Sequence, residues 1–297
     1  SAYPDEPDAQ RATMLGWDMP PASDDGETPA GRLVGLAAPH VSPEGGYRSY
    51  AAAYRRLRPE DAAKTFVILG TSHYGEPEAF GLTRKPYLTP LGAVETDQAI
   101  VGALAAAAPE AVRMEDYCHA SEHSIEFQSV YLQAALGSSL PAGERLRAAP
   151  ILCGSFFRAL ESGRPPEQDE RVRRFMDALS ELAAKRDDLV WVLGIDLAHV
   201  GRRYGDRAAA RVGDSWLSEV RRRDEQRLER VAAGDAQGFF ELVRPGGDEL
   251  RWCGFSPLYT FLRAIGGYRA EILSYEQWNI DPDSVVSFVG VEFRTRN

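Results

Sequence analysis

Three hydrophobic segments of the chain each end on residues that bind metals or transfer protons. They are Leu-Val-Gly-Leu-Ala-Ala-Pro-His40, Phe-Val-Ile-Leu-Gly-Thr-Ser-His73 and Trp-Val-Leu-Gly-Ile-Asp196-Leu-Ala-His199. Each apolar run has the length and β-branched content of a buried strand, so the polar residues follow its carboxyl end. Ligands of open α/β sheets bind at that edge. Because three of the 5 histidines occupy this position, we predict one shared site.

Taken one at a time, these residues fit more than one role. His40 suits a metal ligand or a catalytic base, and the alternative is a histidine that caps the helix predicted to begin near Tyr47. His73 lies in a loop of glycines and hydroxyls that suits anion binding or an oriented imidazole, and the alternative is a loop histidine bonded to backbone. Asp196 and His199 are three residues apart. If this segment bends into a helical turn, the carboxylate faces the imidazole and orients it as a general base. The alternative is an aspartate cap beside an unrelated histidine.

The segment Glu122-His123-Ser-Ile-Glu126 contributes further candidates. It is predicted to begin an amphipathic helix, from whose start Glu122 or His123 enters the site, with His123 the candidate for proton transfer. Acidic residues in a first turn also stabilise any helix, which is the alternative for Glu122 and Glu126. His119 lies in a polar turn and is interpreted as structural.

Cys253 is the cysteine with the strongest functional context. It precedes Gly-Phe-Ser-Pro, where a helix is predicted to begin, and the positive end of that helix is expected to lower the pKa of the thiol. Cys153 ends an apolar strand and is expected to be buried and inert. Cys118 lies in a polar turn without orienting neighbours. Two histidines and one cysteine from separate elements suit zinc, copper or iron.

Strands and helices are predicted to alternate along the chain, which indicates an α/β fold in one domain, with a central mixed sheet flanked by helices. The predicted strands are 32–38, 65–71, 78–83, 147–153, 189–195, 269–275 and 284–293. The predicted helices are 47–57, 97–107, 121–136, 168–185, 212–232, 235–243 and 255–265. Residues 1–30 are predicted to form an extended N-terminal arm, and residues 31–297 the domain.

Composition limits the classes of function. The net charge of −10 argues against bulk nucleic-acid binding and against binding to anionic membranes. No apolar run is long enough to span a bilayer. Three cysteines in 297 residues do not form a disulfide framework. We therefore expect a cytoplasmic protein. Its partner is expected to be an unidentified small-molecule substrate or a peptide, with a homo-oligomer allowed.

From about Arg32 to Phe293 the chain resembles the Memo family, whose bacterial members include AmmeMemoRadiSam system protein B. The resemblance rests on six short motifs in order: Ala-Pro-His40, Leu-Gly-Thr-Ser-His73, Thr-Pro-Leu-Gly92, Glu-His-Ser-Ile-Glu126, Asp196-Leu-Ala-His199 and Cys253-Gly. The Memo family is similar in fold to the class III extradiol dioxygenases, which use non-haem iron. The same fold is therefore implied here.

The resemblance also implies roles for particular residues. His40 and His73 match the two histidine ligands of the dioxygenases, and Cys253 stands where their glutamate ligand lies. His199 matches their acid/base histidine. What is implied is a pocket in which His40, His73 and Cys253 bind iron or copper, with Asp196, His199 and His123 around it.

Three functions fit these residues. The first is a metal-dependent oxidoreductase that uses iron or copper, with His199 moving a proton. The second is a hydrolase that uses zinc or the Cys253 thiol. The third is a protein without catalytic activity that binds a ligand or peptide in the same pocket.

Overall fold

Four parallel strands form the centre of the molecule, because their sequences are almost unbroken runs of apolar residues that suit burial on both faces. The computed structural model describes residues 2–23 and 29–296. The four strands are β1 (Leu33–Ala38), β8 (Leu189–Gly194), β2 (Thr65–Thr71) and β7 (Leu146–Cys153), side by side in that order. Their carboxyl ends therefore meet at one edge of the sheet.

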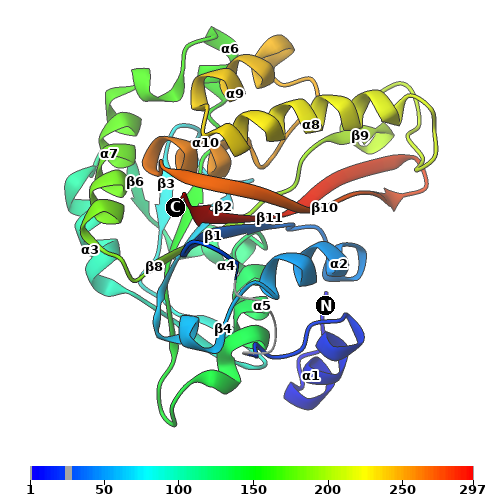
Figure 1. Ribbon diagram of the computed structural model, residues 1–297. Helices are drawn as coiled ribbons and strands as arrows, with labels where there is room; N and C mark the ends of the chain where they lie inside the picture. The colour runs from blue at the N-terminus through cyan, green and yellow to red at the C-terminus, as the bar shows by residue number, and fades with distance from the viewer. Residues whose placement is uncertain (1, 24–28, 297) are drawn as a thin grey trace.

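The complete sheet of the described residues has eleven strands and is mixed. Its main path is β10-β11-β1-β8-β2-β7-β3-β6, with β5 beside β7, β4 beside β5 and β9 beside β11. The remaining strands are β3 (Phe80–Leu82), β4 (Tyr87–Thr89), β5 (Gly92–Thr96), β6 (Val112–Met114), β9 (His199–Gly201), β10 (Tyr268–Asp281) and β11 (Ser284–Thr295). The antiparallel pair β10–β11 forms the long orange and red ribbon in Figure 1.

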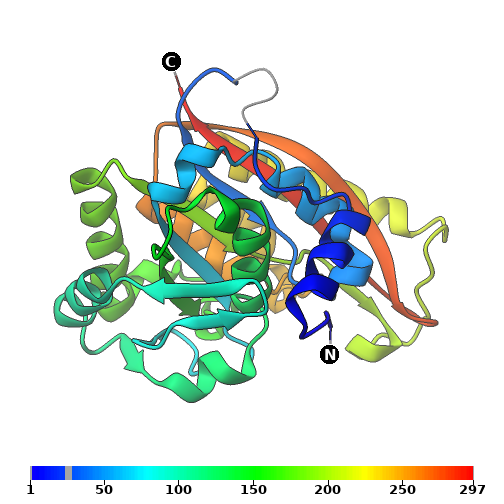
Figure 2. The same ribbon diagram turned by 90° about the horizontal axis from the view of Figure 1, so that it is seen from below.

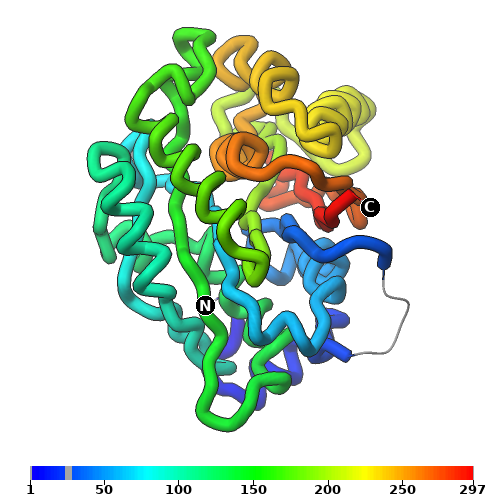
Figure 3. The backbone as a smooth tube through the Cα atoms, turned by 60° about the vertical axis from the view of Figure 1, so that its left-hand side comes forward, coloured from blue at the N-terminus to red at the C-terminus, as the bar shows by residue number. Residues whose placement is uncertain are grey.

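Helices cover both faces of the sheet. They are α1 (Pro7–Gly16), α2 (Pro43–Tyr54), α3 (Gln98–Ala107), α4 (Asp116–Ser121), α5 (Glu126–Leu136), α6 (Phe157–Ser162), α7 (Glu170–Lys185), α8 (Leu217–Ala233), α9 (Ala236–Val243) and α10 (Phe255–Ala264). One core joins the sheet to α3, α7, α8, α9 and α10, and the other joins it to α1, α2 and α5. Figure 3 shows α8 to α10, yellow to orange, gathered on one side of the molecule. The predicted α/β architecture is confirmed.

The structure differs from the sequence-based prediction near the N-terminus. Pro7–Gly16 form helix α1, in which Gln10 and Met14 are buried, instead of an extended arm. Figure 2 shows α1, in dark blue, beside α2. The helix is amphipathic enough to pack, and Met14 joins the core under α2 and α5. Residues 1 and 24–28 of the predicted arm lie outside the described residues.

The predicted helix 121–136 is also wrong at its start. Residues 116–121 form α4, and α5 begins only at Glu126. Glu122 has an extended backbone, with φ −96 and ψ 141. Its carboxylate bonds to His73, and the Ser124 hydroxyl donates to the Thr71 carbonyl at the end of β2. These tertiary hydrogen bonds outweigh local helix propensity.

Several short elements were not predicted. The β4–β5 hairpin, β6 and β9 have three to five residues each, too few for a periodic hydrophobic pattern. Strand β10 extends to Asp281, well beyond the predicted residue 275. Within the described residues, no helix combines the length and apolar character needed to cross a membrane.

Candidate metal centre

The strand ends bring three of the predicted residues together. Each lies two residues beyond the last residue of its strand: His40 follows β1, His73 follows β2 and Asp196 follows β8. The register pairs Ala38 with Gly194 and Gly70 with the same Gly194, so the three loops leave the sheet at one level. Parallel pairing of these strands is therefore what makes the three side chains neighbours.

Cys253 reaches the same edge from the segment before α10. The Thr71 hydroxyl donates to the Cys253 carbonyl at 2.7 Å, and the Gly254 N–H donates to the Asp196 carbonyl at 3.0 Å. A Cβ on Gly254 would lie 2.6 Å from that carbonyl oxygen, so this close approach requires glycine. These contacts fix the Cys253 backbone between the β2 and β8 loops.

The ligating atoms of His40, His73 and Cys253 all lie within 4.8 Å of one another. The Cys253 Sγ is 3.2 Å from His40 Nε2. A tetrahedral metal held by one nitrogen and one sulfur would separate them by about 3.5 Å, given its usual bond lengths. The donor set of two imidazoles and one thiol therefore fits a transition metal of the zinc, copper or iron type.

The second nitrogen of each imidazole is held by a hydrogen bond. His40 Nδ1 lies 3.0 Å from the Gly194 carbonyl, and His73 Nδ1 lies 2.8 Å from Glu122 Oε2. Glu122 also accepts a very short hydrogen bond from the His73 N–H. Acceptors at Nδ1 place the proton there and leave Nε2 with a lone pair, which is the arrangement found around ligating histidines.

His199 and His123 border the cluster. His199 Nδ1 is 2.9 Å from the Leu197 carbonyl, and its Nε2 is 3.9 Å from Cys253 Sγ. Burial lowers the pKa of His199 to about 4, so the ring is neutral at pH 7. His123 lies parallel to the His73 ring at 5.4 Å and perpendicular to the His40 ring at 5.4 Å. Burial, then His73, lowers its pKa.

Asp196 lies near His199, but its hydrogen bonds go to the segment that carries His40. Residues 195–198 form no helical turn. The Asp196 carboxylate hydrogen-bonds to the backbone at His40, while one of its oxygens and a ring nitrogen of His199 still lie within 4.8 Å of each other. The carboxylate accepts from the His40 N–H at 2.8 Å and the Val41 N–H at 3.2 Å, and its other oxygen lies 3.4 Å from His40 Nε2. Burial raises the pKa of Asp196 to about 7.

The expected effect of the helix on Cys253 is also wrong. Burial first, and then the neighbouring Asp196, raises the pKa of the Cys253 thiol well above its usual range. Helix α10 begins two residues later, at Phe255, so its positive end does not offset the cost of a buried thiolate. Without a bound cation the thiol keeps its proton.

The other candidates lie outside this cluster. Glu126 accepts a hydrogen bond from the Tyr3 hydroxyl. His119 bonds to the Tyr87 hydroxyl and the Gly81 carbonyl, at 2.8 and 3.0 Å. Cys153 is fully buried at the end of β7 and Cys118 donates to Glu115. The adjacency of Glu122 and His123 was the sequence signal for this segment, but nothing local indicated that Glu122 would hold His73.

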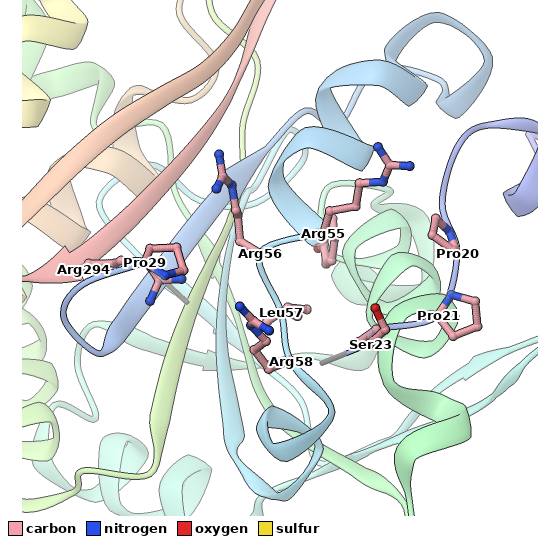
Figure 4. Close-up of a pocket in the computed structure, with 11 residues that line it drawn as sticks. Pro20, Pro21, Ser23, Pro29, Arg55, Arg56, Leu57, Arg58 and Arg294 are labelled. Atoms are coloured by element: carbon pink, nitrogen blue, oxygen red, sulfur yellow. The ribbon is translucent and has the colours of Figure 1, made fainter. Parts of the chain in front are cut away.

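A cavity of about 240 Å³ lies elsewhere, between the N-terminal segment and the end of α2 (Figure 4). Arginines 55, 56, 58 and 294 line it, with several prolines. Arg55 pairs with Asp18 at 2.5 Å and Arg294 with Glu292 at 3.1 Å. Since Arg55 and Arg294 are already paired with carboxylates, we assign the cavity no ligand.

Comparison with known proteins agrees with the resemblance seen in the sequence. The family model described as Memo-like protein matches residues 1–292. The chain belongs to the Memo-like protein family. A MEMO1 family protein of Thermococcus kodakarensis is 27% identical over 270 residues, covering 86% of both chains. A MEMO1 family protein of Methanopyrus kandleri is 26% identical, over 98% of this chain and 95% of that protein. A MEMO1 family protein of Pyrococcus furiosus is 27% identical, over 98% of this chain and 96% of that protein.

Solved structures also match this Memo-like protein, and we report one of them. It is an uncharacterized protein from Escherichia coli K12, with 13% sequence identity and a TM-score of 0.48, over 88% of this chain and 99% of that chain. A likeness this low carries no argument. The family assignment therefore rests on the sequence matches, and the site of the Memo-like protein rests on its own geometry.

Proposed function

We propose that this protein is a metal-dependent oxidoreductase that holds iron or copper through His40 Nε2, His73 Nε2 and Cys253 Sγ. The observation that carries the proposal is the convergence of these three atoms within 4.8 Å, with both Nδ1 atoms engaged elsewhere. Thiolate and imidazole ligands suit copper and iron, and when bound such a metal would supply one-electron chemistry and a Lewis acid.

The protein's own residues would prepare and serve this centre. Glu122 and the Gly194 carbonyl hold the two imidazoles with Nε2 facing inward. The His73 side chain is 30% exposed, which gives a substrate access to the cluster from that side. The His199 Nδ1 atom is bonded to the Leu197 carbonyl and its Nε2 points toward the cluster, so Nε2 is the atom that would accept a proton from a bound substrate.

Metal content tests the proposal first. We would measure iron, copper and zinc by mass spectrometry on untagged protein purified without added metal, beside His40→Ala and Cys253→Ser. Cys118→Ser is the matched control, because that thiol lies on α4, outside the cluster. Near-stoichiometric iron or copper in the wild type and control, lost in both site variants, is the expected result. The metal-loaded wild type is then expected to consume oxygen with a phenolic or other reducing substrate.

A thiol hydrolase is the second candidate, because Cys253 Sγ lies 3.2 Å from His40 Nε2 and 3.9 Å from His199 Nε2. The raised pKa of the thiol argues against it. Alkylation separates the two functions. Rapid stoichiometric reaction of Cys253 with iodoacetamide at pH 6 in metal-free protein would favour the thiol enzyme. Slow reaction, together with tight binding of iron or copper, would favour the metal centre.

A further inference from the structure

One buried carboxylate lies outside the ligand cluster and holds hydrogen bonds to two of its supporting segments. Asp224, on α8, has no exposed surface. It accepts from Trp252 Nε1 at 2.7 Å, from the Tyr275 hydroxyl at 2.8 Å and from the Ser287 hydroxyl at 2.6 Å. Burying a carboxylate costs free energy unless such donors satisfy it, so this residue is specifically accommodated.

Trp252 connects Asp224 to the thiol. It immediately precedes Cys253 in the chain, and its indole is buried. Its backbone N–H donates a very short hydrogen bond to Asp248, and the Arg227 guanidinium lies 5.1 Å from the centre of its ring. Arg227 donates to Asp248 at 3.0 Å. The buried Arg227–Asp248 ion pair therefore fixes both the indole and the backbone of Trp252.

Ser287 connects the same carboxylate to the loop that carries Asp196 and His199. The Ser287 hydroxyl donates to Asp224 and accepts from the Ala198 N–H at 2.9 Å. Its backbone exchanges two more hydrogen bonds with Leu197 and Ala198, at 2.8 and 2.9 Å. This loop is therefore held on β11 at a position set partly by Asp224.

From these contacts we propose that Asp224 is a positioning residue for the metal centre. By binding Trp252 and Ser287 with its two oxygens, it fixes where Cys253 Sγ lies relative to the Asp196–His199 loop. The inference rests on the proposed metal site, because it concerns the geometry of that site. Tyr275 supplies an internal comparison, since its hydroxyl donates to the same carboxylate from β10, a strand that carries neither Cys253 nor the Asp196–His199 loop.

Cobalt(II) is the probe, because a bound thiolate gives it a charge-transfer absorption that reports the metal–sulfur geometry. We would titrate cobalt into wild-type protein, Asp224→Asn, Trp252→Phe, Ser287→Ala and Tyr275→Phe, and record the absorption and the dissociation constant. We expect the first three variants to shift the absorption and to weaken cobalt binding roughly tenfold or more, as loss of outer-sphere partners does at metal sites. Tyr275→Phe is expected to change neither.

The outcomes separate the inference from the proposed function. If wild-type protein binds cobalt without a thiolate absorption, or does not bind it, the proposed ligand set is wrong and the inference fails with it. Suppose that the wild type gives the absorption, but Trp252→Phe and Ser287→Ala have the same absorption and cobalt dissociation constant as Tyr275→Phe. The ligand set then stands and the positioning role is wrong. These two variants decide the question even if Asp224→Asn does not fold.

Discussion

At the scale of single residues, the site depends on which group holds each imidazole. His40, His73 and His199 each present Nδ1 to an oxygen, and two of these oxygens are backbone carbonyls. Glu122 is the exception, since it is a fully buried carboxylate bonded to His73. A carboxylate partner raises the basicity of a ligating imidazole more than a carbonyl does.

Replacing this carboxylate by an amide is therefore expected to weaken metal binding. In Glu122→Gln, the side chain still accepts from His73 but no longer carries a charge, so we expect a 10- to 100-fold weaker affinity for iron or copper. Competition with a chelator of known affinity measures it. Glu126→Gln, which alters a carboxylate bonded to Tyr3, is the control. Equal losses in both variants would contradict the role of Glu122.

His119 allows a prediction about pH and stability away from the metal cluster. Burial lowers its pKa from 6.5 to about 4, so the unfolded chain binds more protons than the folded protein between these values. The free energy of unfolding should therefore fall as the pH drops from about 6.5 to about 4, by roughly 3 kcal/mol from this residue. His119→Gln should lack this part of the slope.

Urea unfolding of both proteins at several pH values measures the effect. Other titrating groups contribute equally to both, so the difference between the two curves isolates His119. If the difference does not depend on pH, His119 has the same pKa in the folded and unfolded states.

At the scale of elements, the start of α5 closes over the strand ends. Ser124 donates to the Thr71 carbonyl at 2.9 Å, and Gln128 donates to the Pro39 carbonyl at 2.8 Å. The Ser124 carbonyl lies so near Gly194 that a Cβ there would be 2.1 Å from its oxygen. The segment that carries Glu122 and His123 is therefore seated directly on β8.

Gly194→Ala should displace this segment. We expect it to destabilise the protein by about 1–3 kcal/mol, because the new methyl group meets backbone that cannot move without breaking hydrogen bonds. Gly102→Ala on α3 is the control, since the nearest atom to its Cβ would be 3.7 Å away. That change should be neutral or stabilise by about 0.5–1 kcal/mol. Urea unfolding measures both, and similar values for the two variants would contradict the packing argument.

At the scale of the whole molecule, the candidate centre joins segments that are far apart in the chain. His40 and Cys253 are 213 residues apart, and His73 and Glu122 are 49 apart. A ligand that binds such a set binds only the folded protein, since the unfolded chain does not bring these atoms together. Metal binding should therefore stabilise the entire sheet and not one loop.

Thermal unfolding tests this expectation. With iron or copper at about a hundred times its Kd, the free energy of unfolding should rise by about 2.7 kcal/mol, and Tm by about 5 °C or more. Cys253→Ser should show no such shift.

A single domain for residues 31–297 is expected to unfold in one step. Circular dichroism and tryptophan fluorescence should therefore report the same unfolding midpoint. Two separate transitions would contradict it.

Much of the fold was predictable because it depends on local patterns. The runs ending at Ala38, Thr71 and Gly194 are apolar over the length of a strand, and each is followed by a residue with a metal-binding or proton-transfer side chain. Short elements such as β9 were missed, because three residues have no detectable period. Helix α1 was missed because its burial depends on α2 and α5.

By itself the sequence determined that His40, His73 and Asp196 follow buried strands, since hydrophobic patterning fixes where a strand ends. Only the tertiary structure decided which carboxylate serves which histidine. Asp196 bonds to His40 across 156 residues and not to His199, three residues away, because strand register and loop packing set these distances. The pKa of Cys253 was likewise decided by burial, which depends on all the elements packed around it and on no local pattern.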